Sequence, residues 1–385
     1  VAVGSLALDA NTEGDNNVSL GYGSLTANTT ADNNVAIGRT ALETNTTGAG
    51  NVAVGKDALL ANTTASNNVA VGIDALTANT TGTENTAVGS NALDANTTGS
   101  YNVAMGMHAL GAQTTGSQNA ALGRNALNGN TEGSSNVALG NHALHSNTTG
   151  NNSTAVGYQS LYVSTTGAHN VAVGYQAGVA VTDGATNTLI GTLCHDNLTT
   201  GDLNTAIGYN LAPSAVGVDS EIVIGSSITG AGTNTVRIGT GGGTATLGLD
   251  GSDTSWAAAS DSRLKKDVAD STVGLSFLND LRPVTFKWNA KNEVAEDLPQ
   301  HDADSSDPIF GEGKAHHGFI AQEVKAVIDN HSDVLDGNNI WHEDPDGTQQ
   351  LSQGNLVPML VKAVQELSAQ VEELKSQPKC KCKGE

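Results

Sequence analysis

Glycine recurs every seventeen residues through the first 225 residues of the chain. The series runs Gly4, Gly21, Gly38, Gly55, Gly72, Gly89, Gly106, Gly123, Gly140, Gly157, Gly174, Gly191, Gly208 and Gly225. Each glycine lies in a pattern close to N-N-V-A-V-G-x-x-A-L-x-A-N-T-T-G-x. A period kept for so long without an insertion indicates stacked coils, each of them one structural unit. We therefore predict a mainly β fold, in which residues 1–225 form a β-solenoid of seventeen-residue repeats.

Each repeat contains two short apolar elements. The sequence V-A-V at 52–54 alternates as a strand does when one face is buried, so we expect Val52 and Val54 to point inward and Ala53 outward. The following glycine ends the strand, where a positive φ or a close backbone approach is needed. Ala58-Leu59 gives a second buried element, and N-T-T-G supplies turn residues. Two strands and two turns per coil predict a flattened β-roll.

The composition agrees with stacked coils. The chain has 46 Gly among 385 residues but only four Phe and three Trp. A compact core depends on large side chains, whereas small ones pack well when the backbone stacks on itself. The repeated N-T-T also fits the N-glycosylation sequon, at Asn28, Asn45, Asn62, Asn79, Asn96 and Asn147. We favour a turn in which the asparagine bonds its own backbone.

The charge and the cysteines exclude several classes of function. The net charge is −22, and residues 1–250 carry 16 acidic and 4 basic residues. This argues against a nucleic-acid partner, because phosphate binding is driven by Lys and Arg. No apolar run is long enough to predict membrane insertion. The three cysteines, Cys194, Cys380 and Cys382, lack the spacing of a disulfide framework or a metal site, so we expect no metal and no cofactor.

The repeats stop after Gly225, and the rest of the chain divides in two. Residues 226–259 form a connecting β segment with apolar runs at 235–239 and 244–247. From Trp256 onward Lys, Phe and Pro become common, which predicts a small α/β domain at 260–385. We expect helices at 271–281 and 319–329, and a strand at 282–288 with alternate residues on one face.

The last helix is predicted at 355–376 and carries an apolar seam. Its residues step by three and four, with Val at a and Leu at d, which is the pattern of a coiled coil. The seam consists of Val357, Leu360, Val364, Leu367, Val371 and Leu374. The alternative is a helix that packs this face on its own domain. The pattern alone does not fix the number of helices.

Two parts of the chain resemble known families. The strand N-V-A-I-G at 34–38 is similar to the N-S-V-A-I-G of the head repeats of trimeric autotransporter adhesins, whose repeats are usually shorter than seventeen residues. The segment S-D-S-R-L-K at 260–265 fits S-D-x-R-x-K. It is followed by L-R-P-V at 281–284, G-F-I-A-Q-E-V at 318–324 and L-V-P-M-L-V-K-A-V-Q-E-L at 356–367. In this order these segments resemble the peptidase S74 family, the C-terminal intramolecular chaperone of bacteriophage endosialidases and tail fibres.

The second resemblance implies that the chain cuts itself. In that family a Ser-Lys dyad cleaves just before the serine, which makes Ser260 the nucleophile and Lys265 the general base. The broken bond is then the peptide bond between Ala259 and Ser260. Asp261 and Arg263 are candidates for orienting the dyad or holding the cut segment. The resemblance also implies a homotrimer.

The chemistry sets conditions on this dyad. A serine hydroxyl needs a base, and a lysine acts as one only if burial lowers its pKa. A spacing of five on a regular helix would place the two side chains roughly 140° apart, so Ser260 must lie at a cap or in a turn. Lys266 is the alternative base. Ser260 could instead be an ordinary helix N-cap, and we interpret His316 and His317 as structural.

Together these features predict a trimeric viral fibre, a tail fibre or spike of a virion, that attaches to a host receptor. The receptor would be a glycan or a surface protein. The C-terminal domain would drive trimerisation and folding and then release itself. The alternative is a non-enzymatic trimeric adhesin of a bacterial cell surface, with the C-terminal region as a trimerisation domain only. A glycan-degrading spike is less favoured, because the repeats show no paired carboxylates.

Overall fold

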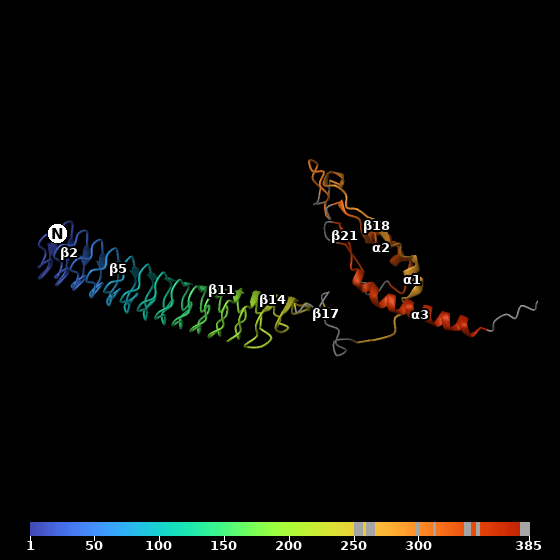
Figure 1. Cartoon of the computed structure of the whole chain (residues 1–385), viewed down its shortest axis with the longest axis horizontal. Coiled ribbons are helices and arrows are strands. Elements are labelled where there is room, and N and C mark those ends of the chain that lie inside the picture. Colours follow the sequence, from blue (N-terminus) through green and yellow to red (C-terminus); the bar gives the residue numbers. More distant parts are fainter. Residues whose placement is uncertain are drawn as a thin grey trace, which may run out of the picture. The chain divides into compact units, whose positions relative to one another are not determined.

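The computed structural model describes residues 1–249, 257–258, 266–296, 301–310, 313–334, 340–343 and 347–377. The chain separates into two compact units, Val1–Ser260 and Asp261–Glu385. The first is a stack of β coils and the second a small mixed α/β domain (Figure 1). Within the ranges given above, no helix has the length and apolar character needed to cross a membrane.

The first unit is the predicted solenoid of seventeen-residue coils, and each coil contains one short strand. Neighbouring strands are parallel and in register at the seventeen-residue period, so that Val52 pairs with Val69 and Ala53 with Ala70. The strands are β1 (Ala2–Val3), β2 (Val18–Leu20), β3 (Val35–Ile37), β4 (Val52–Val54), β5 (Val69–Val71), β6 (Thr86–Val88), β7 (Val103–Met105), β8 (Ala120–Leu122), β9 (Val137–Leu139), β10 (Thr154–Val156), β11 (Val171–Val173), β12 (Thr188–Ile190), β13 (Thr205–Tyr209) and β14 (Glu221–Ser226).

The predicted orientation of the strand residues was wrong. Ala53 is fully buried, whereas Val52 and Val54 lie on the partly exposed face. The coil is narrow, and its interior is filled by Leu59 from the opposite side, also fully buried. Only a methyl group fits in the remaining space, so alanine faces inward and the larger valines face outward.

The second buried element is a turn, so the prediction of two strands per coil was also wrong. Leu59 has a left-handed backbone, with φ of 52°, and its N–H donates to the carbonyl of Ala75 in the next coil at 3.0 Å. A left-handed conformation costs roughly 1–2 kcal/mol for a residue with a side chain. Complete burial of a leucine contributes about 1.5–3 kcal/mol, which offsets that cost in each coil where the leucine is buried.

The periodic glycines are required by both conditions that the sequence suggested. Gly55 has φ of +145°, and a Cβ on it would lie 2.2 Å from the carbonyl oxygen of Gly72. Backbone therefore approaches backbone where each strand ends. A residue with a side chain would be strained by its φ and would also clash with the next coil.

Two ladders of buried asparagine tie the coils together. In one ladder the backbone N–H of Asn51 donates to Oδ1 of Asn34 at 2.9 Å. In the other, Nδ2 of Asn62 donates to Oδ1 of Asn45 at 2.9 Å and to the carbonyl of Ala65 at 3.0 Å. The second ladder is the asparagine of N-T-T, and its amide nitrogen is buried and bonded. The turn interpretation is confirmed, and the sequon nitrogen is not accessible for glycosylation in this fold.

The interior changes near the C-terminal end of the solenoid. In one coil Gly178 stands at the position of the buried leucine, equivalent to Leu59. Leu189 stands at the centre of β12, where other strands have a small residue. A Cβ on Gly178 would lie 2.6 Å from Cδ1 of Leu189, so the larger strand residue fills the space that the missing leucine leaves. In the next coil His195 takes the leucine position and is fully buried.

The parallel stack ends in an antiparallel hairpin. Strands β15 (Thr235–Thr240) and β16 (Gly243–Gly248) correspond to the two predicted apolar runs, and β17 (Ala257–Ala258) pairs with β16. Glu221 stands where earlier coils have the ladder asparagine. Its carboxylate accepts the N–H of Ser214 at 3.0 Å and the N–H of Gly232 at 2.8 Å. These bonds close the polar ladder.

The second unit is a mixed α/β domain, as its composition predicted. Its elements are α1 (Leu275–Asp280), β18 (Val284–Phe286), η2 (Lys291–Glu293), β19 (His316–Gly318), α2 (Ala321–Asn330), β20 (Trp341–Glu343), β21 (Gln349–Leu351), η4 (Gln353–Leu356) and α3 (Val357–Ser376). The core contains Phe277 of α1, Val324 and Ile328 of α2, and Leu356 before α3. All three predicted helices form, although α1 begins four residues later than expected.

Candidate functional site

The predicted cleavage segment lies outside the described residues. Ala259, Ser260, Asp261, Arg263 and Lys265 all fall there, so the dyad and its supporting residues stay predictions. The described residues on either side are the short strand β17, whose Ala258 pairs with Ala245, and the exposed Lys266. The two compact units divide between Ser260 and Asp261. The predicted scissile bond is thus one peptide bond before the boundary between the units.

Two of the recognised segments are joined by an ion pair. Nε of Arg282, just before β18, donates to Oε2 of Glu323 at 2.9 Å, and the second guanidinium nitrogen donates to Oε1. The hydrogen bond from Arg282 holds the pKa of the Glu323 carboxyl below its usual value. Both side chains are largely exposed, so we expect little stabilisation. The bidentate geometry does fix the first turn of α2 beside the start of β18.

The strands β18 and β19 bring the same two segments into a small antiparallel sheet. Val284 pairs with Gly318 and Phe286 with His316. A Cβ on Gly318 would lie 3.2 Å from Cε1 of Phe286, which explains a glycine at this position. A shallow pocket of about 310 Å³ lies here, lined by Pro283, Val284, Thr285, His317, Gly318, Phe319 and Gln353.

The two histidines belong to this sheet, in β19. The ring of His316 lies 5.8 Å from that of Phe286, and Nδ1 of His317 lies 3.4 Å from the hydroxyl of Thr285. Neither of these two contacts involves a carboxylate, and the structural role of both histidines stays a prediction.

Helix α3 packs on its own unit by one face only. On the inner face Ala363 is buried, and the Glu366 carboxylate accepts the N–H of Leu275 at 2.8 Å. A Cβ on Gly274 would lie 2.6 Å from the same carboxylate, so the glycine is required for this approach. These contacts join α1 to α3.

An adjoining face of α3 carries the predicted seam. Its six residues, Val357, Leu360, Val364, Leu367, Val371 and Leu374, are between 45% and 66% exposed. The seam is therefore not the face that α3 packs on its own unit, and this contradicts the alternative reading of the pattern. A shallow groove runs beside Val364, Leu367 and Val371.

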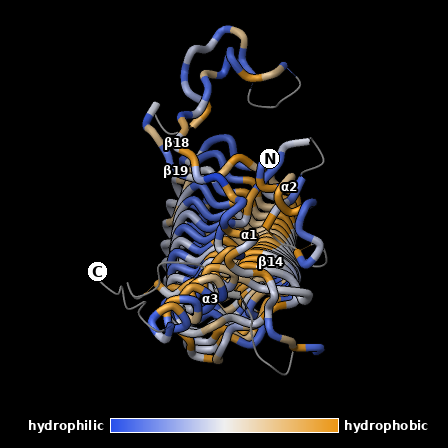
Figure 2. Tube along the Cα trace, turned by 90° about the vertical axis from the view of Figure 1, so that its right-hand side faces the viewer, coloured by the Kyte–Doolittle hydropathy of each residue, from blue (hydrophilic) through white to orange (hydrophobic). Residues whose placement is uncertain are grey.

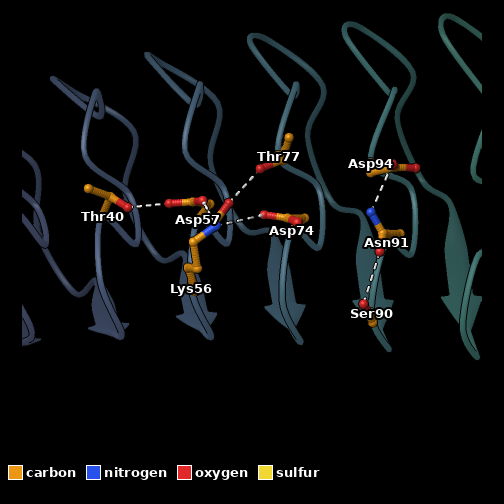
Figure 3. Close-up of polar contacts among 8 residues, drawn as sticks. All are labelled: Thr40, Lys56, Asp57, Asp74, Thr77, Ser90, Asn91 and Asp94. Carbon is orange, nitrogen blue, oxygen red and sulfur yellow. Dashed lines mark hydrogen bonds and ion pairs between the residues drawn. The ribbon is translucent and has the colours of Figure 1, made fainter.

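Charged side chains also gather on the turns of the solenoid, where they bond to one another. Lys56 is bonded to Asp57 and lies 3.9 Å from Asp74, while Thr40 donates to Asp57 (Figure 3). Burial acts to raise the pKa of Asp57, but hydrogen bonds from Lys56 and Thr40 lower it overall. In the described parts of the chain, no three His, Cys, Asp or Glu side chains are arranged to hold a metal ion. This polar row links neighbouring coils.

The buried titratable groups of the solenoid were not predicted from the sequence. Burial lowers the pKa of His195 to about 4, although Glu221 acts to raise it. Burial likewise raises the pKa of the Cys194 thiol to about 12. The signal was present in the repeat, since these residues occupy the positions of the buried Ala-Leu pair.

Comparison with known proteins relates the second unit to a known family. Residues 260–333 match the family model Peptidase S74, described as chaperone of endosialidase. The C-terminal part of the chain is therefore similar to this family, and its combination with a solenoid is consistent with a phage fibre-like protein. The match includes the segments at 281–284 and 318–324, whereas that at 356–367 lies beyond it. No curated protein and no solved structure matches the chain.

Proposed function

We propose that this chain is a trimeric viral fibre whose C-terminal chaperone assembles it and then cleaves itself off between Ala259 and Ser260. One observation carries the proposal. The match to the self-cleaving chaperone family begins at Ser260, and the boundary between the two compact units follows that same residue. A cut before Ser260 would separate the solenoid from the chaperone, with only Ser260 of the first unit left on the chaperone.

The proposed reaction requires only groups of this chain. Neutral Lys265 takes the proton of the Ser260 hydroxyl, whose oxygen attacks the carbonyl carbon of Ala259. The C–N bond breaks, and the nitrogen of Ser260 leaves as an amine after accepting a proton. Water then hydrolyses the ester, which frees the carboxylate of Ala259 and restores the hydroxyl. Lys265 must be neutral for the first step, so its surroundings must lower its pKa.

The exposed seam of α3 supports assembly through this helix. Six large apolar residues along one stripe of a helix would be unfavourable in water, and matching helices of other copies would cover them. The adjoining face of this helix is already occupied by α1. Three copies are proposed from the resemblance to the trimeric families, because a Val and Leu seam by itself does not set the number.

The outer face of the solenoid supports contact between copies along its length. The first and third residues of the strands point outward and are mostly Val, Ile or Leu; Val103, Met105 and Leu122 are 42–50% exposed. Figure 2 shows that hydrophobic residues gather along one side of the coils, where β14 is labelled. We assign this face to contacts with the same face of the other copies.

Cleavage then makes a slowly folding assembly permanent. The strands pair over long sequence distances and present apolar faces, so folding is expected to be slow and prone to mispairing. A trimerising domain raises the effective concentration of the chains. After its removal, separated chains could not easily reassemble, so the fibre would be kinetically stable.

The proposed location is the virion, where the solenoid attaches to a host receptor. The second candidate is a bacterial surface adhesin in which residues 260–385 only hold three copies together. It is favoured by the similarity of the repeats to adhesin heads. The two candidates differ in one observable, the cut before Ser260.

The intact masses of purified variants test the proposal. We expect the wild-type chain to split between Ala259 and Ser260, whereas Ser260→Ala and Lys265→Ala stay whole and still form trimers. Ser262→Ala lies in the same segment and is the matched control, which should cleave. If instead Lys265→Ala cleaves and Lys266→Ala stays whole, the general base is Lys266 and not Lys265. An uncut wild-type trimer would favour the adhesin.

A further inference from the structure

One row of positions on the solenoid holds most of its tyrosines and basic residues. It is the position directly after each periodic glycine. Its occupants are Ser5, Tyr22, Arg39, Lys56, Ile73, Ser90, Met107, Arg124, Asn141, Tyr158, Tyr175, Thr192, Tyr209 and Ser226. Four of the six tyrosines of the chain and three of the four basic residues at 1–250 occur here. Such concentration at one position is not needed for packing, because these side chains point away from the core.

Two tyrosines of this row form a stacked platform. The rings of Tyr158 and Tyr175, in successive coils, have centroids 5.5 Å apart and planes inclined by only 12°, so they stack on each other with an offset. They are 43% and 48% exposed. The edges and the outer parts of the faces of this pair are open to solvent, and exposed apolar groups of this kind commonly mark a binding surface.

Amide groups adjoin the platform. Gln159 and Gln176 follow the two tyrosines, and Nε2 of Gln176 donates to Oε1 of Gln159 at 2.8 Å. This bond orients the two side chains, and each amide keeps further donors or acceptors. Stacked rings beside oriented amides provide apolar contact and hydrogen bonds at the same place.

A second aromatic group, of three rings, lies in the coil of Tyr158 and in the coil before it. The rings of His145 and Tyr162 are stacked with centroids 5.1 Å apart, and His142 lies 5.2 Å from His145. Burial lowers the pKa of both histidines, which favours the neutral imidazole. The aromatic patch, defined as Tyr158, Tyr175, Gln159, Gln176 and the ring cluster of His142, His145 and Tyr162, thus spans the coils around residues 142–176.

We propose that the aromatic patch binds a glycan, with sugar rings packed against the exposed edges and outer faces of the Tyr158–Tyr175 stack and hydroxyl groups bonded to Gln159 and Gln176. This rests on the proposed function, since it names the receptor class of the fibre. The C–H faces of a pyranose match a flat ring, and its hydroxyls match amide donors and acceptors. An extended glycan could follow the rod, because the two tyrosines repeat at the spacing of the coils.

Two other kinds of partner fit the patch less well. A peptide strand would need a free sheet edge, but the strands of coils 9–11 are paired on both sides. A nucleic acid would need a basic surface, whereas residues 1–250 carry 16 acidic and 4 basic residues. The amides therefore favour the glycan.

The experiment uses the assembled full-length protein on an array of neutral and acidic bacterial surface polysaccharides. The affinity for the polysaccharide bound best is then measured for the variants. We expect Tyr158→Ala with Tyr175→Ala to weaken binding about tenfold or more. The corresponding Phe replacements keep the platform and should bind nearly as wild type. Tyr22→Ala is the matched control, since Tyr22 occupies the same row and is 54% exposed, but its row neighbours are Ser5 and Arg39.

Three results would overturn the inference. The assembled wild type could bind no polysaccharide on the array, or Tyr22→Ala could weaken binding as much as the double variant. The double variant could also dissociate the oligomer, which would assign the patch to contacts between copies. Mass and oligomeric state are measured on the same samples. A protein that assembles and cleaves but binds no glycan contradicts this inference alone, whereas tyrosine-dependent binding by an uncleaved protein contradicts only the proposed cleavage.

Discussion

The carboxylate of Glu366 on α3 accepts the backbone N–H of Leu275 at the start of α1, at 2.8 Å and across 91 residues of sequence. The first N–H groups of a helix have no partner within it, and here a side chain of α3 supplies one. The contact fixes which face of α3 is turned inward. The seam is left outward, where other copies can reach it.

Replacing this carboxylate should loosen α1 from α3. We expect Glu366→Ala to lower the free energy of unfolding of the C-terminal unit by about 1 kcal/mol, the usual value of a helix cap. Urea unfolding of the full chain, in an uncleaved Ser260→Ala background, measures it. Glu372→Ala is the control, because the partner of Glu372 among the described residues is the exposed Lys375 of its own helix. Equal losses in both variants would show that the contact does not stabilise the unit.

The periodic glycines should tolerate no side chain. We expect Gly55→Ala to destabilise the neighbouring coils by at least about 2 kcal/mol, since it adds a clash with the carbonyl of Gly72 to a strained φ. Hydrogen exchange of the amides near residues 52–72 detects this locally. Gly243→Ala is the control, because a Cβ there meets nothing within 4 Å. Unchanged exchange in Gly55→Ala would contradict the close approach of the coils.

Stability of the solenoid should fall with acid because of His195. Its pKa is lowered from 6.5 to about 4 in the fold, so the unfolded chain binds the proton first as the pH falls. The stabilisation is complete above pH 6.5 and is lost progressively down to about pH 4, by roughly 3 kcal/mol. We expect His195→Leu, which restores the residue of the other coils, to flatten the dependence of unfolding on pH in this window.

A neighbouring variant controls for a general effect of repacking the interior. Cys194→Ala restores the small residue common at its position and removes a thiol whose pKa is about 12. That group does not titrate between pH 4 and 6.5, so the acid dependence should persist. If His195→Leu retains the wild-type dependence, the carboxylates of the coils are responsible instead.

The repeat predicted the architecture but not the contents of a coil. Spacing alone revealed the stack and the glycines, because the same backbone contact recurs at Gly55 and at every equivalent position. Alternation in V-A-V does not say which face is inside; that depends on the width of the coil, which Leu59 determines from the other side. A left-handed leucine is unfavourable locally, so no propensity rule would predict it. The dyad of Ser260 and Lys265 rests on family resemblance. A spacing of five residues does not by itself bring two side chains together.

The seam of α3 should be necessary for both assembly and cleavage if the chaperone works as a trimer. Leu367→Asp places a charge on the exposed apolar stripe, and we expect it to leave the helix formed but to abolish the trimer. Gln370→Asp adds the same group on the same helix outside the seam and should remain trimeric and cleave. Sedimentation velocity gives the oligomeric state, and intact mass gives the extent of cleavage. If Leu367→Asp is monomeric yet fully cleaved, the dyad is complete within one chain. If it stays trimeric, the solenoid face alone holds the copies together.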